Sequence, residues 1–334
     1  MDYKEIFKRF SKLNILIIGD VMVDSYMWGQ VNRISPEAPV PVCAVVKKEN
    51  RLGGAANVAL NIASMGAEPI LCSVIGNDIS GEILLSLMRN EHLSTQGMIT
   101  STQRQTTSKT RFLSGSSQLL RVDEETDREI SKEEERDFIK RIFDILAAKR
   151  IDAIVFQDYD KGTITKNVIK KVADKAKQMN IPTSTDPKKR NFNHYNNITL
   201  FKPNLKELKE GLNLNFEDIS KVNEDILMQA ADILHKKHNI EKVFITLSDK
   251  GVFMMDYSEQ MRVPYHIKAH LRQIADVSGA GDTVISVATL CLALKIKAAD
   301  IARISNLAGG LVCEKVGVSP IDKNILYNEL IKQI

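Results

Sequence analysis

Short apolar runs that end in Gly or Asp alternate with helical segments along most of the chain. The run Asn14–Ile18 is closed by Gly19-Asp20, and the run Pro69–Ile75 is closed by Gly76. Continuous apolar runs of this length are typical of parallel strands that are buried on both faces. Helical segments between successive strands are typical of βαβ units. The sequence therefore predicts an α/β fold with a mostly parallel central sheet flanked by helices.

Two segments depart from this alternation. Residues 26–50 contain prolines beside a β-prone stretch, and residues 94–125 are rich in Thr, Ser and Gln. Proline cannot donate a ladder hydrogen bond, so the first segment belongs at an edge or in a lid. We expect a small β-lid from about 26–50 and 100–125, with short antiparallel strands in 106–125 that pair with residues 40–46. No linker or repeat interrupts the chain, so we expect a single domain over residues 1–334.

Composition narrows the class of protein. The chain has 334 residues, 43% hydrophobic and 26% charged, with a net charge of +4. Its basic residues are scattered, whereas nucleic-acid binding would favour a concentrated stripe, and no apolar run approaches the ~18 residues of a membrane span. The four cysteines lack CxxC spacing, which indicates reduced core residues and no zinc site. We therefore expect a cytoplasmic protein that binds neither nucleic acid nor membranes.

The stretch Asp276–Asp282 has two glycines around an alanine and precedes an apolar helical run. The amides of Gly279, Ala280 and Gly281 would point unpaired at the helix N-terminus, where the macrodipole also favours an anion. Asp282 beside them could take a proton from a hydroxyl that attacks a phosphoryl group. Asp is also a common N-cap. For these residues alone, capping is the better-supported interpretation.

Polar residues also follow the predicted strands, and in open α/β sheets ligands bind beyond the carboxyl ends of the strands. Asp20 and Asp24 could hold sugar hydroxyls there, or they could be ordinary turn residues. Asn57 opens a small-residue helix after Gly53-Gly54 and could hydrogen-bond a polyol, although tight helix packing explains the neighbouring alanines equally well. Asp158 belongs to another polar cluster at a strand end.

Further candidates are cations and a helix start. Lys109, Arg111 and Arg121 in the lid could contact an anionic substrate, but a solvated lid face is the better-supported interpretation of any one of them. Lys161 at a strand end is a candidate for a phosphate contact. The segment Asn204–Glu207 has the spacing of a capping box and could also orient Mg²⁺ waters; the cap is the better-supported interpretation. Small residues in 302–311 would leave room for an adenine ring or for close packing.

Taken together, these motifs resemble the ribokinase-like (phosphofructokinase-B) family of sugar kinases over nearly the whole chain. Gly53–Ala59 is similar to the N-terminal family signature, Asn204–Glu207 to the NxxE motif and Asp276–Asp282 to the DTxGAGD signature. The resemblance implies a ribokinase-like fold whose lid often forms a homodimer interface. It also implies Mg²⁺-dependent transfer of the ATP γ-phosphoryl group to a sugar phosphate.

The resemblance also implies roles for individual residues. Asp282 matches the catalytic base, and Gly279, Ala280 and Gly281 match the anion hole. The residues assigned to ATP are Asn204, Glu207, Ser248, Gly251, Asn306 and Gly310. Glu207 would hold Mg²⁺ through water, and whether a monovalent cation assists near residues 276–282 is left open. The residues assigned to the sugar are Asp20, Asp24, Gly53, Gly54, Asn57 and Asp158.

The contacts to a substrate phosphate rest on residue type alone, because phosphate is bound by Lys and Arg. The candidates are Lys109, Arg111, Arg121, Lys161 and Lys188.

Within the family the resemblance is nearest to the kinases of D-glycero-β-D-manno-heptose 7-phosphate, which serve lipopolysaccharide synthesis. The segments that carry it are Gly19–Asp24, Arg33–Val42, Leu120–Asp123, Asp158–Gly162 and Asp186–Lys188. Lys189 departs from the pattern, which has glycine there. Some relatives carry a fused nucleotidyltransferase domain, so a chain that ends at Ile334 would be the stand-alone kinase. The alternatives are a kinase for another sugar or sugar phosphate, and a catalytically silent sugar-binding regulator.

Overall fold

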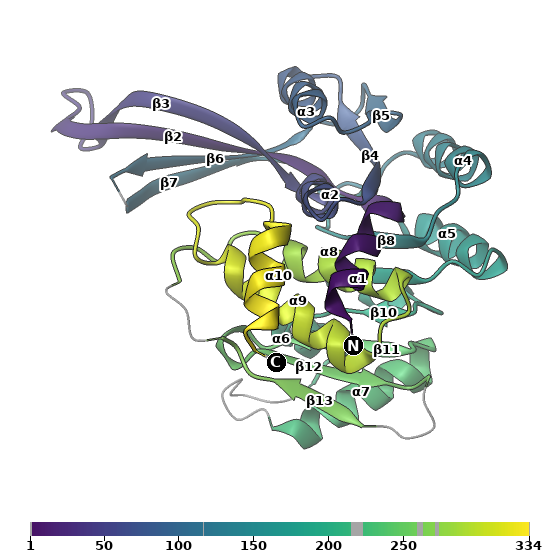
Figure 1. The fold of residues 1–334 in the computed structure, drawn as a ribbon. Coiled ribbons are helices and arrows are strands. Elements are labelled where there is room, and N and C mark those ends of the chain that lie inside the picture. The colour runs from purple at the N-terminus through teal and green to yellow at the C-terminus, as the bar shows by residue number, and fades with distance from the viewer. Residues whose placement is uncertain (1, 116, 215–222, 259–262, 271–273, 334) are drawn as a thin grey trace.

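A nine-stranded sheet forms the centre of the molecule (Figure 1). The computed structural model describes residues 2–115, 117–214, 223–258, 263–270 and 274–333. From one edge the strands are β13 (Pro264–Ile267), β12 (Val252–Asp256), β11 (Lys242–Thr246), β10 (Leu200–Phe201), β9 (Thr183–Asp186), β8 (Ala153–Gln157), β1 (Asn14–Gly19), β4 (Glu68–Gly76) and β5 (Gly97–Ser101). Only the β11–β12 and β12–β13 pairs are antiparallel in this sheet. The mostly parallel sheet is therefore confirmed.

Helices cover both faces of this sheet (Figure 1). One face packs against α1 (Tyr3–Arg9), α2 (Ala55–Ser64), α3 (Ile79–Asn90), α8 (Ala280–Ala293), α9 (Ala298–Val312) and α10 (Lys323–Ile331). The other face packs against α4 (Lys132–Ala148), α5 (Lys166–Gln178), α6 (Leu205–Leu212) and α7 (Glu224–His238).

Strand β1 shows why its sequence is apolar at every position. Ile15 and Ile17 enter the core on one face, Leu16 and Ile18 enter the core on the other, and all four are fully buried. Because successive side chains of a strand point to opposite faces, a strand between two helical layers needs apolar residues throughout.

A second, four-stranded sheet projects from the body as the lid (Figure 1). Its order is β3 (Pro41–Gly54), β2 (Val21–Ile34), β6 (Thr107–Ser114) and β7 (Ser117–Glu124). The antiparallel pairing of β6 with β7 is confirmed, but the predicted pairing of this region with residues 40–46 is wrong. Strand β6 pairs with β2 in parallel, because β2 lies between β3 and β6 and separates them. Pro41 thus begins an edge strand, where its missing N–H costs no ladder hydrogen bond.

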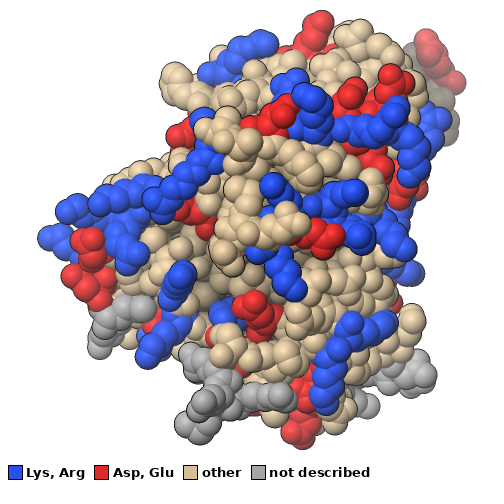
Figure 2. Space-filling view, turned by 90° about the vertical axis from the view of Figure 1, so that its right-hand side faces the viewer, with Lys and Arg blue, Asp and Glu red and all other residues tan. Residues whose placement is uncertain are grey.

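The surface carries mixed charge. Figure 2 shows Lys and Arg side chains interspersed with Asp and Glu over the face at the right of Figure 1. Among the described residues, no helix is both long and apolar enough to cross a membrane.

Candidate active site

Asp282 lies in the first turn of α8 and is 4% exposed. Its Oδ2 accepts a hydrogen bond from Nδ2 of Asn57 at 2.7 Å. Its Oδ1 accepts from Oη of Tyr159 at 2.7 Å and from Nε2 of Gln157 at 3.0 Å. The N-cap of α8 is Gly279, so the capping interpretation of Asp282 is wrong. The carboxylate is turned instead toward the ends of α2 and β8.

The electrostatic environment makes Asp282 a base of useful strength. Burial raises the pKa of its carboxyl to about 6, although the hydrogen bonds from Asn57 and Tyr159 stabilise the charged form and oppose that rise. Such a group is ionised at neutral pH and is more basic than an exposed aspartate. A general base is most effective when its pKa lies near the working pH.

Backbone amides at the start of α8 lie beside this carboxylate. Gly279 has φ of +81°, a conformation that a residue with a side chain rarely adopts, and a Cβ there would lie 3.0 Å from Nδ2 of Asn57. Within the described part of the chain, the amides of Gly279 and Gly281 have no hydrogen-bond acceptor. The Ala280 amide, predicted to be free, donates to the carbonyl of Val277 at 3.3 Å. The turn at Gly279 brings that carbonyl back, so Gly279 and Gly281 supply the free donors.

A cavity of about 570 Å³ opens in front of these groups. All six residues that were assigned to ATP line it, namely Asn204, Glu207, Ser248, Gly251, Asn306 and Gly310. Val252, Val284 and Gly309 add an apolar wall, and Nδ2 of Asn306 donates to the carbonyl of Lys268 at 2.8 Å. The structure therefore brings residues that lie more than 100 positions apart in the sequence together around one cavity beside Asp282.

Asn204 and Glu207 form the predicted capping box of α6. Oδ1 of Asn204 accepts from the Glu207 amide at 2.8 Å, and Oε2 of Glu207 accepts from the Asn204 amide at 2.9 Å. The second oxygen of Glu207 pairs with the ammonium of Lys188. The cap is therefore confirmed, and the same carboxylate faces the cavity.

Asp186, which the sequence analysis did not single out for the site, fits a hydrated cation. Its Oδ2 pairs with Nζ of Lys202 at 2.9 Å, while its buried Oδ1 lies 3.9 Å from Nζ of Lys188 and has no hydrogen-bond partner among the described residues. No cluster of three or more metal-ligating side chains occurs among the residues that the structure describes. Mg²⁺ needs only one or two carboxylates because it keeps several waters, so Asp186 and Glu207 suit it. The signal available in the sequence was the position of Asp186 at a strand end, before Pro187.

The family description "pfkB family carbohydrate kinase" matches residues 12–324. The chain belongs to the pfkB family of carbohydrate kinases. It is accordingly a carbohydrate kinase, and kinases of this family use ATP and Mg²⁺.

Relatives of this pfkB kinase include bifunctional proteins. The bifunctional protein HldE of Pelobacter propionicus is 36% identical over 320 residues, which are 95% of this chain and 63% of the relative. HldE of a Caulobacter species is 38% identical over 316 residues, 94% of this chain and 62% of the relative. The kinase thus spans a little less than two thirds of the length of these relatives.

Solved structures confirm the ribokinase-like fold. Phosphofructokinase-2 from Escherichia coli superposes with a TM-score of 0.76 at 19% identity, covering 96% of this chain and 99% of that one. Ribokinase from Arabidopsis thaliana superposes with a TM-score of 0.69 at 16% identity, covering 96% and 98%.

Several residues predicted to hold the sugar form hydrogen bonds with other residues of the kinase. Asp20 accepts hydrogen bonds from the amides of Tyr159, Lys161 and Thr163 at 2.9–3.1 Å. Asn57 donates to Asp282 and accepts from Nδ2 of Asn61 at 3.2 Å. Asp20 and Asn57 therefore fix the loop after β8 and the carboxylate of Asp282.

Asp158 is turned away from the cavity. It is fully buried, and its Oδ2 accepts from Nδ2 of Asn191 and Oη of Tyr195, each at 3.0 Å. Burial, together with the charge of Asp20, raises the pKa of Asp158 to about 7. The structure does not bring this predicted substrate residue into the cavity.

The lid residues gather on one face of the four-stranded sheet. Asp24, Lys109 and Asp123 lie directly opposite one another on β2, β6 and β7, so their side chains share a face. Asp24 is buried and pairs with Arg111, and a Cβ on Gly53 would collide with the Asp24 carboxylate. Gly54, with φ of +61°, is the N-cap of α2. Arg121 pairs with Asp123 at 2.9 Å.

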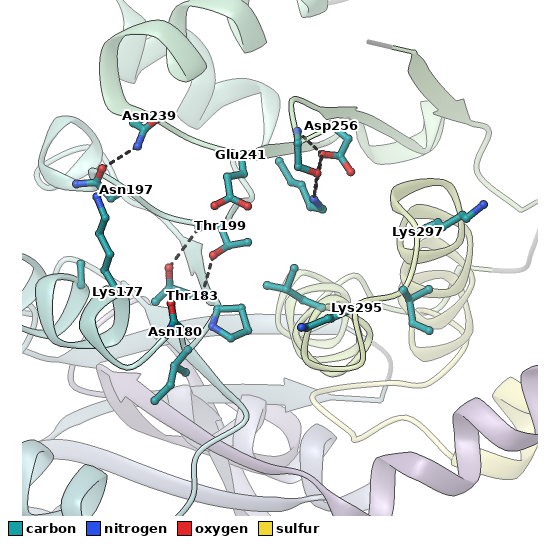
Figure 3. A pocket seen from close by; sticks show the side chains of 17 residues that line it. Lys177, Asn180, Thr183, Asn197, Thr199, Asn239, Glu241, Asp256, Lys295 and Lys297 are labelled. Atoms are coloured by element: carbon teal, nitrogen blue, oxygen red, sulfur yellow. Dashed lines mark hydrogen bonds and ion pairs between the residues drawn. The ribbon is translucent and has the colours of Figure 1, made fainter. Parts of the chain in front are cut away.

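A second cavity of about 520 Å³ lies at the amino ends of β9 and β11 (Figure 3). Thr183 and Thr199 exchange hydrogen bonds in its wall, and Glu241 and Lys295 line it. It contains none of the predicted site residues. In this type of sheet ligands bind at the carboxyl ends of the strands, so the cavity beside Asp282 is the candidate active site.

Proposed function

We propose that the protein transfers the γ-phosphoryl group of ATP to the anomeric hydroxyl of D-glycero-β-D-manno-heptose 7-phosphate and forms the 1,7-bisphosphate, an ADP-heptose precursor for lipopolysaccharide synthesis. The observation that carries a kinase reaction at this place is the buried Asp282 carboxylate beside the free amides of Gly279 and Gly281. The relatives named HldE support the choice of a heptose.

In the proposed reaction Asp282 accepts the proton of the anomeric hydroxyl as its oxygen attacks the γ-phosphorus. A new P–O bond forms to the sugar, the bond between the γ-phosphorus and the β-phosphate bridging oxygen breaks, and ADP leaves. The amides of Gly279 and Gly281, at the positive end of α8, stabilise the negative charge on the transferred group. Asn57, Gln157 and Tyr159 hold the carboxylate in place.

The cavity in front of α8 would take ATP, with Asp186 and Glu207 holding a hydrated Mg²⁺. When bound, Mg²⁺ neutralises charge on the phosphate oxygens. Lys188 and Lys202 line the same cavity and would add positive charge there. One structure of phosphofructokinase-2 contains potassium. We propose that a monovalent cation also binds near residues 276–282 of this kinase.

We also propose a cytoplasmic homodimer that forms through the lid. Leu120 and Val122 on β7 are 57% and 42% exposed and lie on the face opposite to Lys109 and Asp123. A partner lid would cover this apolar face. The related phosphofructokinase-2 has a tetrameric inhibited form.

A coupled ADP-release assay tests the substrate. We expect turnover with heptose 7-phosphate to exceed turnover with fructose 6-phosphate, ribose and adenosine. A higher kcat/KM for another member of this panel would assign the chain to that substrate instead. Absence of ADP release with every sugar would favour the sugar-binding regulator.

A further inference from the structure

Glu125, just beyond the end of β7, bridges two lysines from distant parts of the chain. Its Oε2 lies 2.7 Å from Nζ of Lys109 on β6, and its Oε1 lies 2.7 Å from Nζ of Lys161 after β8. The side chains of both lysines are 16% exposed, and that of Glu125 is 29% exposed. The two ammonium groups therefore share the Glu125 carboxylate in a partly enclosed place, where Lys109 also pairs with Asp123 at 3.0 Å.

This place lies on the lid side of Asp282. Lys161 and Tyr159 belong to one loop, and their amides donate to the same oxygen of Asp20. The Tyr159 hydroxyl in turn reaches Asp282. Neither Lys109 nor Lys161 lines the cavity in front of α8, so the two ammonium groups are separate from the proposed ATP site.

The neighbouring cations are less available to a ligand. Arg111 pairs with Asp24, whose side chain is only 5% exposed. Lys188 pairs with Glu207 in the cavity in front of α8. Glu125 differs because it lies outside the strand and retains access to solvent. Glu125 can therefore move away from its partners without disturbing a strand.

The donor arrangement around Glu125 suits a phosphate. A carboxylate that accepts from two different ammonium groups occupies the same donors as two oxygens of a phosphate, and the phosphate dianion carries more charge and a third oxygen. A neutral sugar has no group that could replace the displaced carboxylate.

We propose that Lys109 and Lys161 form the subsite for the phosphate of the sugar phosphate, and that Glu125 occupies this subsite until the substrate displaces it. The proposal rests on the proposed function, since it takes the acceptor to be a phosphorylated sugar. Displacement of Glu125 by a sugar without a phosphate is unfavourable, because both partly exposed ammonium groups would lose the Glu125 carboxylate, while Lys109 alone would retain its ion pair with Asp123. Glu125 thus contributes specificity by excluding unphosphorylated sugars.

Titration calorimetry with inorganic phosphate tests the subsite without any turnover. The full chain is first saturated with Mg²⁺ and a non-hydrolysable ATP analogue, so that phosphate cannot bind at α8. We expect Glu125→Gln to tighten phosphate binding on the order of tenfold, as the loss of two partly exposed ion pairs allows. Lys109→Met and Lys161→Met should each weaken it by a similar factor.

Glu68→Gln is the matched control, because Glu68 pairs with Lys149 at the same 2.7 Å but lies at the amino end of β4 and contacts neither Lys109 nor Lys161 within the described part of the chain. Its phosphate affinity should equal that of the unmodified protein. Unchanged or weaker phosphate binding by Glu125→Gln would overturn the proposal and leave Glu125 as a contact that fastens the lid. Since no sugar is present, this outcome does not depend on which sugar the enzyme phosphorylates.

Kinetics provide the second readout. Glu125→Gln should lower the KM for the sugar phosphate and raise kcat/KM for the unphosphorylated sugar. An equal change for both sugars would contradict a role in recognising the phosphate.

Discussion

At the scale of single residues, Asp282 is held by neutral donors. Asn57, Gln157 and Tyr159 all contact its carboxylate, while the nearby ammonium of Lys202 pairs with Asp186 at 2.9 Å. A cation in direct contact would lower the pKa of Asp282 and weaken it as a base. The ion pair with Asp186 therefore engages the Lys202 ammonium, which does not hydrogen-bond to Asp282 within the described part of the chain.

Replacement of Asp282 by Asn should remove the base and keep the shape of the site. We expect kcat to fall on the order of 10²- to 10⁴-fold, with ATP affinity retained in titration calorimetry. Near-normal turnover by Asp282→Asn would refute the assignment of the base.

The pH profile should report the same group. The carboxyl pKa is about 6, and only the ionised form can accept a proton. We therefore expect kcat/KM to rise with pH up to about 6 and to level off above it. A profile that is flat between pH 5 and 8 would contradict this prediction.

Tyr159→Phe should move that profile to higher pH. The Tyr159 hydroxyl stabilises the charged carboxylate, so its removal raises the pKa of Asp282 further. Tyr257→Phe is a matched control, because Tyr257 donates to Asp232 at the same 2.7 Å away from the cavity. A shift of the same size in both variants would exclude a specific role for Tyr159.

At the scale of elements, the start of α8 depends on the backbone conformation of Gly279. A side chain would be strained at its φ of +81°, and a Cβ would lie in tight contact with Nδ2 of Asn57, at 3.0 Å. In this conformation the amides of Gly279 and Gly281 have no acceptor among the residues that the structure describes. The two amides that we propose as the anion hole thus belong to one helix end.

Gly279→Ala should cost about 1–3 kcal/mol in the free energy of unfolding, because a side chain is strained at this φ, and it should also lower kcat. Gly115→Ala is the control, since Gly115 has φ of +58° with no atom within 4 Å of an added Cβ. Denaturant unfolding and ADP release measure the two effects. Loss of stability with unchanged kcat in Gly279→Ala would argue against the anion hole.

At the scale of the whole molecule, the lid places ionic groups on one face and apolar groups on the other. Lys109, Arg121 and Asp123 share the first face. Leu120 lies opposite Phe112 on the second. This division would let one sheet serve a substrate and a partner lid at once.

The proposed dimer can be tested on the apolar face of the lid. We expect Leu120→Asp to shift the protein from dimer to monomer in sedimentation velocity, because a buried charge without a partner is costly in an interface. Ile79→Asp is the control, since Ile79 is 77% exposed and lies outside the lid. A dimer that persists in Leu120→Asp would place the interface elsewhere.

The sequence by itself determined the features that neighbouring residues encode. Apolar strands such as Ile15–Ile18 required a sheet between two helical layers, and the spacing of Asn204 and Glu207 produced the capping box of α6. The six positions that the resemblance assigned to ATP line one cavity, and their role in binding ATP stays a prediction. The apolar strand and the capping box can both be predicted because the residues that define each of them are close together in the sequence.

Only the tertiary structure decided which distant groups meet. Asp282 binds Asn57 across 225 positions of sequence and Gln157 across 125, and β6 joins β2 and not residues 40–46. The pairing of Lys109 and Lys161 with Glu125 has the same origin. Residue type shows that a carboxylate or ammonium group needs a partner, but the packing of strands and loops selects that partner, and the partner sets whether the group is available for chemistry.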